Sequence, residues 1–306
     1  MADILLHNLL LLLLAPLLPG VIGKTKAFFA GRKGAPLLQL YYDLARLARK
    51  GMVVSDTTSW VFFAGPVLAL AVPLLAGQFL PFGALAAPLS FNGDALVYVY
   101  MFGLLRFFTA SAALDTGSPF EGMGAAREVS YAALLEPGIL LVLLVLGRLA
   151  GDFSLQGMLS SATLSASWHG SEVALGLVTA ALLVVVLAEN ARIPVDDPNT
   201  HLELTMIHEV MVLDHSGPAL GLIEYGSALK LWLTGALVIQ LVVPLLLPPQ
   251  LGASALTAAF VVGQMLLAVI IGVIESAMAR LSLPRIPALI IGAGLLAAFA
   301  LVLVLR

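Results

Sequence analysis

The stretch ENARIPVDDPNTHLELTMIHEVMVLDHSGPALGLIEY, residues 189–225, lies between two long apolar segments and concentrates the charge of the chain. It holds seven of the chain's eighteen acidic residues: Glu189, Asp196, Asp197, Glu203, Glu209, Asp214 and Glu224. Arg192 is its only formal positive charge, and its histidines are His201, His208 and His215. Carboxylate and imidazole groups gathered in a chain that otherwise avoids charge are expected to hold or move protons, or to face a partner.

The composition around this stretch is that of a membrane protein. Hydrophobic residues make up 60% of the chain and charged residues only 11%, against about 25% charged in soluble domains. Apolar runs of about 20 residues, without the alternation of barrel strands, predict helices. We expect an all-α polytopic membrane protein, one membrane domain over residues 1–306, with about eight transmembrane helices. They are predicted at roughly 3–22, 59–82, 95–114, 131–150, 172–190, 227–248, 254–279 and 284–305.

The basic residues predict the orientation. Twelve of the fifteen lie at the connections after the first, third, fifth and seventh spans, which the positive-inside rule assigns to the cytoplasm. Both termini then face outward, and Asp3 with no basic n-region indicates a retained first span rather than a signal peptide. The loops expected on the inner side are residues 23–58, 115–130 and 190–226. The first contains an amphipathic helix that is expected to lie in the headgroup region, or else to border a cavity or a partner.

The second inner loop and the start of the fourth span add further acids. These residues are Asp115, Glu121, Glu128 and Glu136, with Arg127 among them. Gly117, Gly122 and Gly124 are expected to allow a tight turn at the membrane surface. Glu136 enters a span, where a lone ionised acid is costly, although it fits a helix-end acid beside a solvated loop as well. Acids so crowded must raise each other's pKa values or find cations. The nearest cations in sequence are Arg106, Arg127 and Arg192.

The third inner loop predicts a second helix. Pro194 and Pro198 interrupt any helix that continues from the fifth span. Asn199 or Thr200 can cap a new one.

On that helix His201 and His208 share a face, with Glu209 on its flank. An isolated histidine is usually structural, but two beside acids and a membrane span favour proton handling. The pair His208-Glu209 begins a metalloprotease motif, which fails because residue 212 is valine. No nucleotide-binding or hydrolase motif is present, and no basic aromatic patch indicates nucleic acid. The chain has no cysteine, so it supplies no thiolate to an iron–sulfur cluster and no metal site is expected.

Charges within the spans complete the candidate site. Arg106 lies in the third span, Glu189 ends the fifth and Glu275 is near the inner end of the seventh. Each can pair structurally, or together they can form a polar route from the cytoplasmic face into the bilayer. The candidate residues of this route are Asp115, Glu121, Glu128, Glu136, Glu189, Asp196, Asp197, His201, Glu203, His208, Glu209, Asp214, Glu224 and Glu275, with Arg106, Arg127 and Arg192 as charge partners. No residue is assigned a catalytic role.

Three stretches resemble one family. They are the segment 189–217, the segment ALDTGSPFEGMGAAREVSYAALLEPG at 113–138 and the segment GRKGAPLLQLYYDLARLARKG at 31–51. Together they are similar to the membrane subunit that respiratory complex I shares with the group 4 membrane-bound nickel–iron hydrogenases. The resemblance covers essentially the whole chain.

Details resemble the hydrogenase branch, which includes the membrane subunits of formate hydrogenlyase and hydrogenase-4. Asn199 and His201 stand where the quinone-reducing branch has acids in a PEAESEL-like run. Pro119 and Glu121 depart from the small residues expected in the preceding turn, so the family does not fix the local geometry there.

The resemblance implies a non-catalytic subunit in the cytoplasmic membrane of a bacterium or archaeon, without a cofactor of its own. It implies partners: the hydrogenase large and small subunits, a ferredoxin-like iron–sulfur subunit and antiporter-like membrane subunits, all within membrane lipid. Iron–sulfur clusters and a nickel–iron site are expected in those partners, and the acidic loops are expected to couple redox events to proton or sodium movement. The alternatives are a quinone-site subunit of a complex I-like oxidoreductase, an independent secondary transporter and a passive scaffold.

Overall fold

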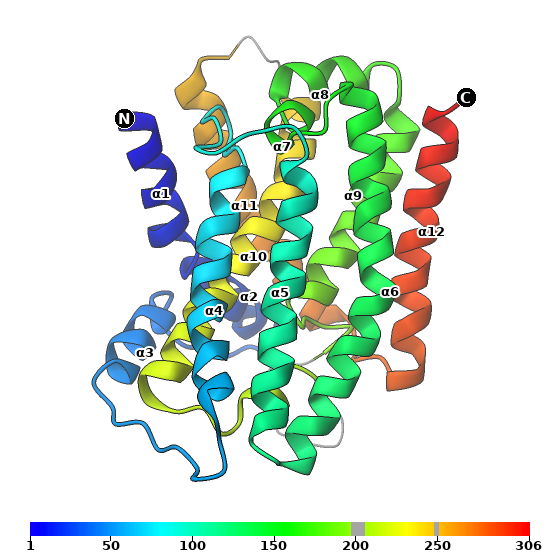
Figure 1. Ribbon diagram of the computed structural model, residues 1–306. Coiled ribbons are helices and arrows are strands. Elements are labelled where there is room, and N and C mark those ends of the chain that lie inside the picture. The colour runs from blue at the N-terminus through cyan, green and yellow to red at the C-terminus, as the bar shows by residue number, and fades with distance from the viewer. Residues whose placement is uncertain (197–205, 248–250) are drawn as a thin grey trace.

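The computed structural model describes residues 1–196, 206–247 and 251–306, and over these ranges it is helical apart from one bridge between Phe82 and Leu85. Eight helical segments in the described residues are long and apolar enough to cross a membrane, as predicted (Figure 1). The α-helices are α1 (Ala2–Leu14), α2 (Leu17–Phe29), α3 (Gln39–Leu47), α4 (Trp60–Ala76), α5 (Asp94–Asp115), α6 (Pro119–Ala150), α7 (Leu155–Met158), α8 (Ser161–Trp168), α9 (Glu172–Glu189), α10 (Gly217–Leu246), α11 (Ala253–Ala277) and α12 (Ile286–Val304). The 3₁₀ turns are η1 (Gly77–Phe79), η2 (Glu209–Val212) and η3 (Leu283–Arg285).

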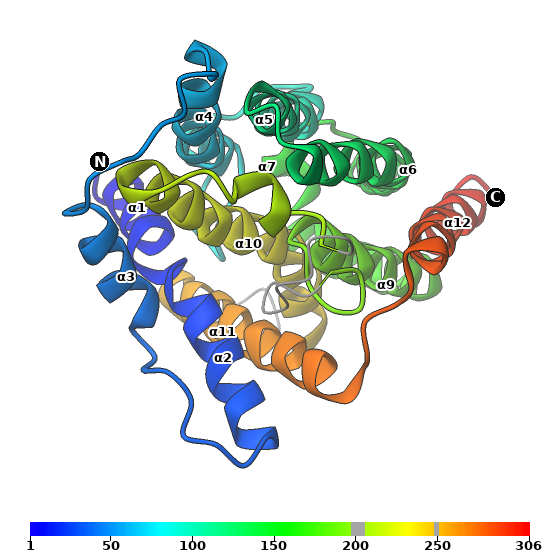
Figure 2. The same cartoon turned by 90° about the horizontal axis from the view of Figure 1, so that it is seen from below.

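Helix α10 forms the centre of the bundle, with α4, α9 and α11 packed around it (Figure 2). Its residues Leu229, Trp232 and Leu233 are completely buried. Gly226 lets α4 approach closely, since a Cβ there would lie 1.9 Å from the Ala69 carbonyl oxygen. Both termini lie at the end of the bundle that carries α7 and α8, and α3 lies at the opposite end (Figure 1). The membrane side that each end faces stays a prediction.

The first span is broken. Pro16 follows α1 and has no N–H to donate, and the last α1 bond, from Ala15 N to Leu11 O, is 3.4 Å long. Beyond the break α2 runs in a new direction beneath α11 (Figure 2). The crossing is close because Gly272 has no side chain: a Cβ there would lie 2.7 Å from the Thr25 Cβ.

The loop predicted at residues 115–130 is mostly helical instead. Gly117 makes the turn with a φ of 72°, and Pro119 starts α6 as its first residue, where a proline loses no helical hydrogen bond. Gly122 and Gly124 lie inside α6 rather than in a turn. Gly124 has a packing role, since a Cβ there would lie 2.3 Å from Val210 Cγ1 in η2.

The helix predicted to start at Asn199 or Thr200 does not hold for the described part of that loop. Residues 206–208 are not helical, only the short turn η2 follows, and α10 begins at Gly217, so Glu224 is helical rather than in a loop. Two carboxylates compete for the amides that a helix would use. Asp196 Oδ2 accepts from the Ile207 and His208 amides at 2.9 and 3.2 Å, and Glu121 accepts from the Asp214 amide at 3.0 Å. The predicted site residues Asp197, His201 and Glu203 lie outside the described residues.

Candidate functional site

Arg106 of α5 lies at the centre of a buried ion-pair network. Its guanidinium is 2.6 Å from Glu136 and 2.6 Å from Glu189, and 3.4 Å from Glu128. The second oxygen of Glu189 lies 2.8 Å from Lys230 Nζ on α10. Four helices therefore contribute three acids and two cations to one cluster, which we call the Arg106 network. Only 9% of the Arg106 side chain and 5% of the Glu189 side chain are exposed.

A second group of ion pairs surrounds Glu275 of α11, whose side chain is fully buried. Lys26 Nζ on α2 lies 2.8 Å from one carboxylate oxygen, and Arg192 Nη1 lies 3.6 Å from the other. A separate pair joins Arg280 to Asp196 at 2.9 Å. The segment that follows α9 is therefore held to both ends of the α11–α12 connection by charge.

A cavity of about 650 Å³ lies beside the Glu275 pairs. Its polar wall is formed by Lys26, Asn190, Arg192, His208, Glu209, Glu224, Ser227 and Glu275. Its apolar wall includes Pro19, Ile22, Leu40, Ile193 and Val212. Helices α2, α3, α10 and α11 and the segment after α9 thus enclose a space large enough for many water molecules or for a bulky ligand.

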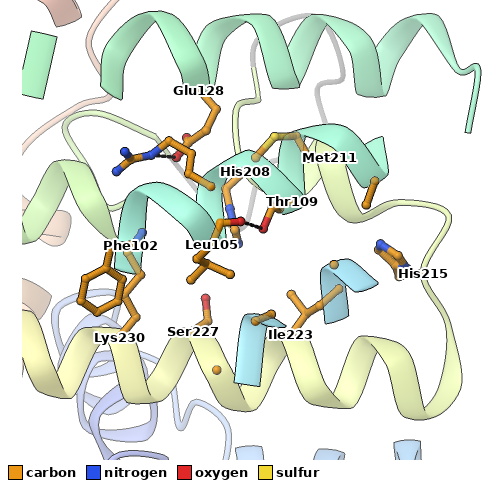
Figure 3. A pocket seen from close by; sticks show the side chains of 15 residues that line it. Phe102, Leu105, Thr109, Glu128, His208, Met211, His215, Ile223, Ser227 and Lys230 are labelled. Atoms are coloured by element: carbon orange, nitrogen blue, oxygen red, sulfur yellow. Dashed lines mark hydrogen bonds and ion pairs between the residues drawn. The ribbon is translucent and has the colours of Figure 1, made fainter. Parts of the chain in front are cut away.

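A smaller cavity of about 40 Å³ connects this region to the Arg106 network. Figure 3 shows Glu128, His208 and Lys230 among the side chains that line it. His208, Ile223 and Ser227 line both this cavity and the large one. His208 is the titratable residue of these three and therefore lies between the two groups of charges.

The turn η2 and its flanks carry shifted titration. Burial, together with the neighbouring Glu224 and Asp196, raises the pKa of Glu209 to about 7, although Arg192 opposes the shift. Burial lowers the pKa of His208, against the opposing effect of Glu128. Burial also lowers the pKa of His215 to about 4. Glu209 thus exchanges its proton near neutrality, whereas both histidines favour the neutral form.

His215 is held in place by stacking. Its ring lies on that of Phe62, with 4.1 Å between the ring centroids.

The structure separates the remaining predicted residues from these networks. Asp115 accepts from the Ser59 amide and hydroxyl at 2.6 and 2.9 Å, so it fixes the start of α4. Arg127 donates to the Met206 carbonyl at 2.7 Å. Glu121 and Asp214 meet through the backbone amide of Asp214. These contacts hold the loops in place.

Sequence reasoning missed three cations of the site. Lys26, Lys230 and Arg280 served only to predict orientation, although each is the partner of a predicted acid. The available signal was the cost of an unpaired charge at membrane depth, which makes any lysine in or beside a span a candidate partner. Among the described residues, no group of three or more histidine or acidic side chains is placed to hold a metal.

Comparisons with known proteins agree with this architecture. A family model described as NADH dehydrogenase matches residues 2–306. The chain is 31% identical to formate hydrogenlyase subunit 4 of Escherichia coli over 291 residues, which is 92% of each protein. It is 31% identical to hydrogenase-4 component C of the same organism, over 89% of this chain and 85% of that protein.

More distant relatives share the fold. A membrane component of the NADH-quinone oxidoreductase of Anaplasma phagocytophilum is 26% identical over 67% of this chain and 63% of that protein. A chain of the membrane-bound sulfane sulfur reductase, an archaeal respiratory membrane complex, superposes with a TM-score of 0.81 at 18% identity, covering 99% of this chain and 98% of that chain. With eight candidate spans and a family match over almost its whole length, the chain is a multi-pass membrane protein that belongs to the NADH dehydrogenase family.

Proposed function

We propose that this chain is the membrane anchor and ion-coupling subunit of a multisubunit, complex I-related nickel–iron hydrogenase. It joins a peripheral redox arm to the movement of protons or sodium ions. The two relatives at 31% identity, named for formate hydrogenlyase and hydrogenase-4, support the hydrogenase assignment. The absence of cysteine supports a role without electron carriers in this chain.

The observation that carries the coupling role is the continuity of the charged groups. The large cavity and the small cavity meet at His208, and the small cavity is lined by Arg106, Glu128 and Lys230. Glu209 gives up its proton near pH 7 at the start of this series. A buried arginine shared by three acids responds to any change in charge nearby, because the interactions act at low local dielectric.

Replacement of Glu189 by glutamine tests the coupling role. The variant keeps the shape of the side chain but loses the charge that both Arg106 and Lys230 face. In the purified complex in liposomes, we expect redox turnover to continue while ion translocation per electron falls at least tenfold. Glu172→Gln, at the exposed opposite end of the same helix, is the matched control. Wild-type translocation by the Glu189 variant would refute the proposal and favour a passive scaffold.

The anchoring role has its own test. Purification in mild detergent is expected to recover a nickel–iron subunit and iron–sulfur subunits with this chain. Ion flux from the purified chain alone in liposomes would instead identify an independent transporter.

A quinone-site subunit is the second candidate function, and the 650 Å³ cavity favours it. One wall is apolar and the other carries hydrogen-bonding groups, as a quinone requires. Quinone-dependent turnover that a bulky substitution such as Ser227→Phe abolishes would support this function. Turnover that is independent of quinone would exclude it and leave the hydrogenase assignment.

A further inference from the structure

The break in the first span leaves two backbone carbonyls without helical donors at membrane depth. Pro16 cannot donate to the Leu12 carbonyl four residues earlier, and α1 ends at Leu14. An unsatisfied carbonyl is costly in the apolar part of a bilayer. Leu13 is exposed on the outside of the bundle, so the protein itself must supply its partner.

Two tyrosines from other elements supply the missing donors. The Tyr225 hydroxyl on α10 donates to the Leu12 carbonyl at 3.0 Å. The Tyr41 hydroxyl on α3 donates to the Leu13 carbonyl. The residues involved are 213 and 28 positions apart in sequence, respectively. The break is therefore fastened to two different elements of the fold.

Both elements are walls of the large cavity. Leu40, next to Tyr41, and Glu224, next to Tyr225, line it. From α2, just beyond the break, Ile22 and Lys26 line it as well. The direction that α2 takes after Pro16 decides whether Lys26 reaches Glu275, 2.8 Å away on α11.

We propose that Tyr41 and Tyr225 are positioning residues that act through Lys26. Their hydroxyls hold the break in the first span at one angle, so that α2 presents Lys26 to Glu275 and closes its side of the cavity. The loss of either hydroxyl frees α2 to change its angle at Pro16, and the Lys26–Glu275 pair becomes one of several arrangements.

A distance measurement tests this placement directly. Because the chain has no cysteine, Phe29→Cys and Met278→Cys give two unique spin-label sites. Each lies three residues beyond a partner of the Lys26–Glu275 pair, and each is exposed. In the full chain in lipid nanodiscs, we expect one narrow distance distribution by pulsed electron paramagnetic resonance. Tyr41→Phe with Tyr225→Phe is expected to widen this distribution at least twofold.

Tyr42→Phe is the matched control. Tyr42 is on the same helix as Tyr41 but its side chain is exposed, and no hydrogen bond of its hydroxyl is found in the described residues. The control is expected to keep the narrow distribution. An unchanged distribution in the Tyr41/Tyr225 variant would overturn the proposal, and so would equal widening by Tyr42→Phe. If the double variant is not recovered, the same criteria apply to each single variant.

A second measurement asks whether the tyrosines act through Lys26, and it rests on the proposed function. In the assembled complex, Lys26→Gln and the tyrosine double variant are each expected to lower ion translocation severalfold. Combining them is expected to lower it no further than the stronger of the two, whereas a merely structural role would give effects that multiply. If Lys26→Gln alone leaves translocation unchanged, Lys26 has no part in coupling, and the distance distribution alone decides the positioning role.

Discussion

The Arg106 network and the Glu275 pairs are made of the same residue types in opposite proportions. Around Arg106, three acids face two cations, whereas Glu275 faces two cations alone. The Arg106 network borders cavities of only about 20 to 40 Å³, and the Glu275 pairs border one of about 650 Å³.

The comparison teaches that burial and hydration have been separated. Where little water can enter, an excess of acid is held by a central guanidinium. Where water can enter, the cation excess is close to Glu209 and Glu224, which supply further carboxylates. The dry cluster is therefore expected to depend on each of its charges, and the wet one to respond to pH.

The largest expected effect is that of Arg106→Gln. Removing the guanidinium leaves three acids with Lys230 as their one cation among these groups. Breaking a buried pair on one side costs about 3–5 kcal/mol, so the variant is expected to lose most of its folded, assembled protein. Thermal unfolding in detergent and the yield of assembled complex measure this. Wild-type stability would show that the network contributes nothing to the fold and would remove the contrast with the cavity.

The next effect is a pH dependence at the wet side. The pKa of Glu209, about 7, lies above its ordinary value of 4.5, so the folded protein takes up a proton between these pH values. Stability from this group is present at pH 4.5 and below, and it falls by about 3 kcal/mol as pH rises to 7. Glu224, Asp196 and Arg192 are the charged groups that set this shift.

Glu209→Gln removes this dependence because its amide does not titrate. The thermal midpoint of the variant is expected to exceed that of the wild type at pH 8 by more than at pH 5. His215 has the opposite slope, since its lowered pKa costs stability as pH falls below 6.5, but it is present in both proteins and cancels in the difference. Parallel pH profiles would contradict a raised pKa at Glu209.

A smaller effect is expected at the packing contact between α6 and η2. A Cβ at Gly124 would lie 2.3 Å from Val210 Cγ1 and 2.9 Å from the Ile207 carbonyl oxygen. Gly124→Ala is therefore expected to cost about 1–3 kcal/mol and to shift η2, with His208 at its start. Gly122→Ala is the control, because the nearest atom to its Cβ is 3.7 Å away. Equal stability of the two variants would mean that η2 moves without cost.

The smallest effect is expected at an exposed pair. Arg46 and Asp43 on α3 are 2.7 Å apart, with 64% of the Arg46 side chain exposed. Arg46→Gln is expected to change stability by less than about 1 kcal/mol. Measured beside Arg106→Gln, it separates the effect of a lost positive charge from that of a lost buried partner, and a comparable loss in both would erase the distinction.

The spans could be predicted from the sequence because each depends on one local property, a long apolar run. The same property misplaced the start of α6, since polar residues near Glu121 suggested a loop although Pro119 is well suited to begin a helix. The acids of the site were also readable, because charge at membrane depth is rare. Their pairing was not, since Arg106 and Glu189 are 83 positions apart and meet only through helix packing.

The turn at residues 206–216 could not be predicted for a different reason. Its helix-like pattern of His208 and Glu209 was real, but Asp196 and Glu121 bind amides that a helix needs. Such long-range competition by side chains for backbone donors leaves no periodic trace in the sequence.

The carboxylates of Asp196 and Glu121 have a consequence for how mutational scans of such proteins are interpreted. Both fasten main-chain amides on either side of η2, so an alanine there can abolish transport by unravelling a turn rather than by deleting a carrier. Asp196→Asn and Glu121→Gln keep an acceptor oxygen for those amides. An acid that tolerates its amide but not alanine is a fastener, and an acid that tolerates neither is a candidate for the ion path.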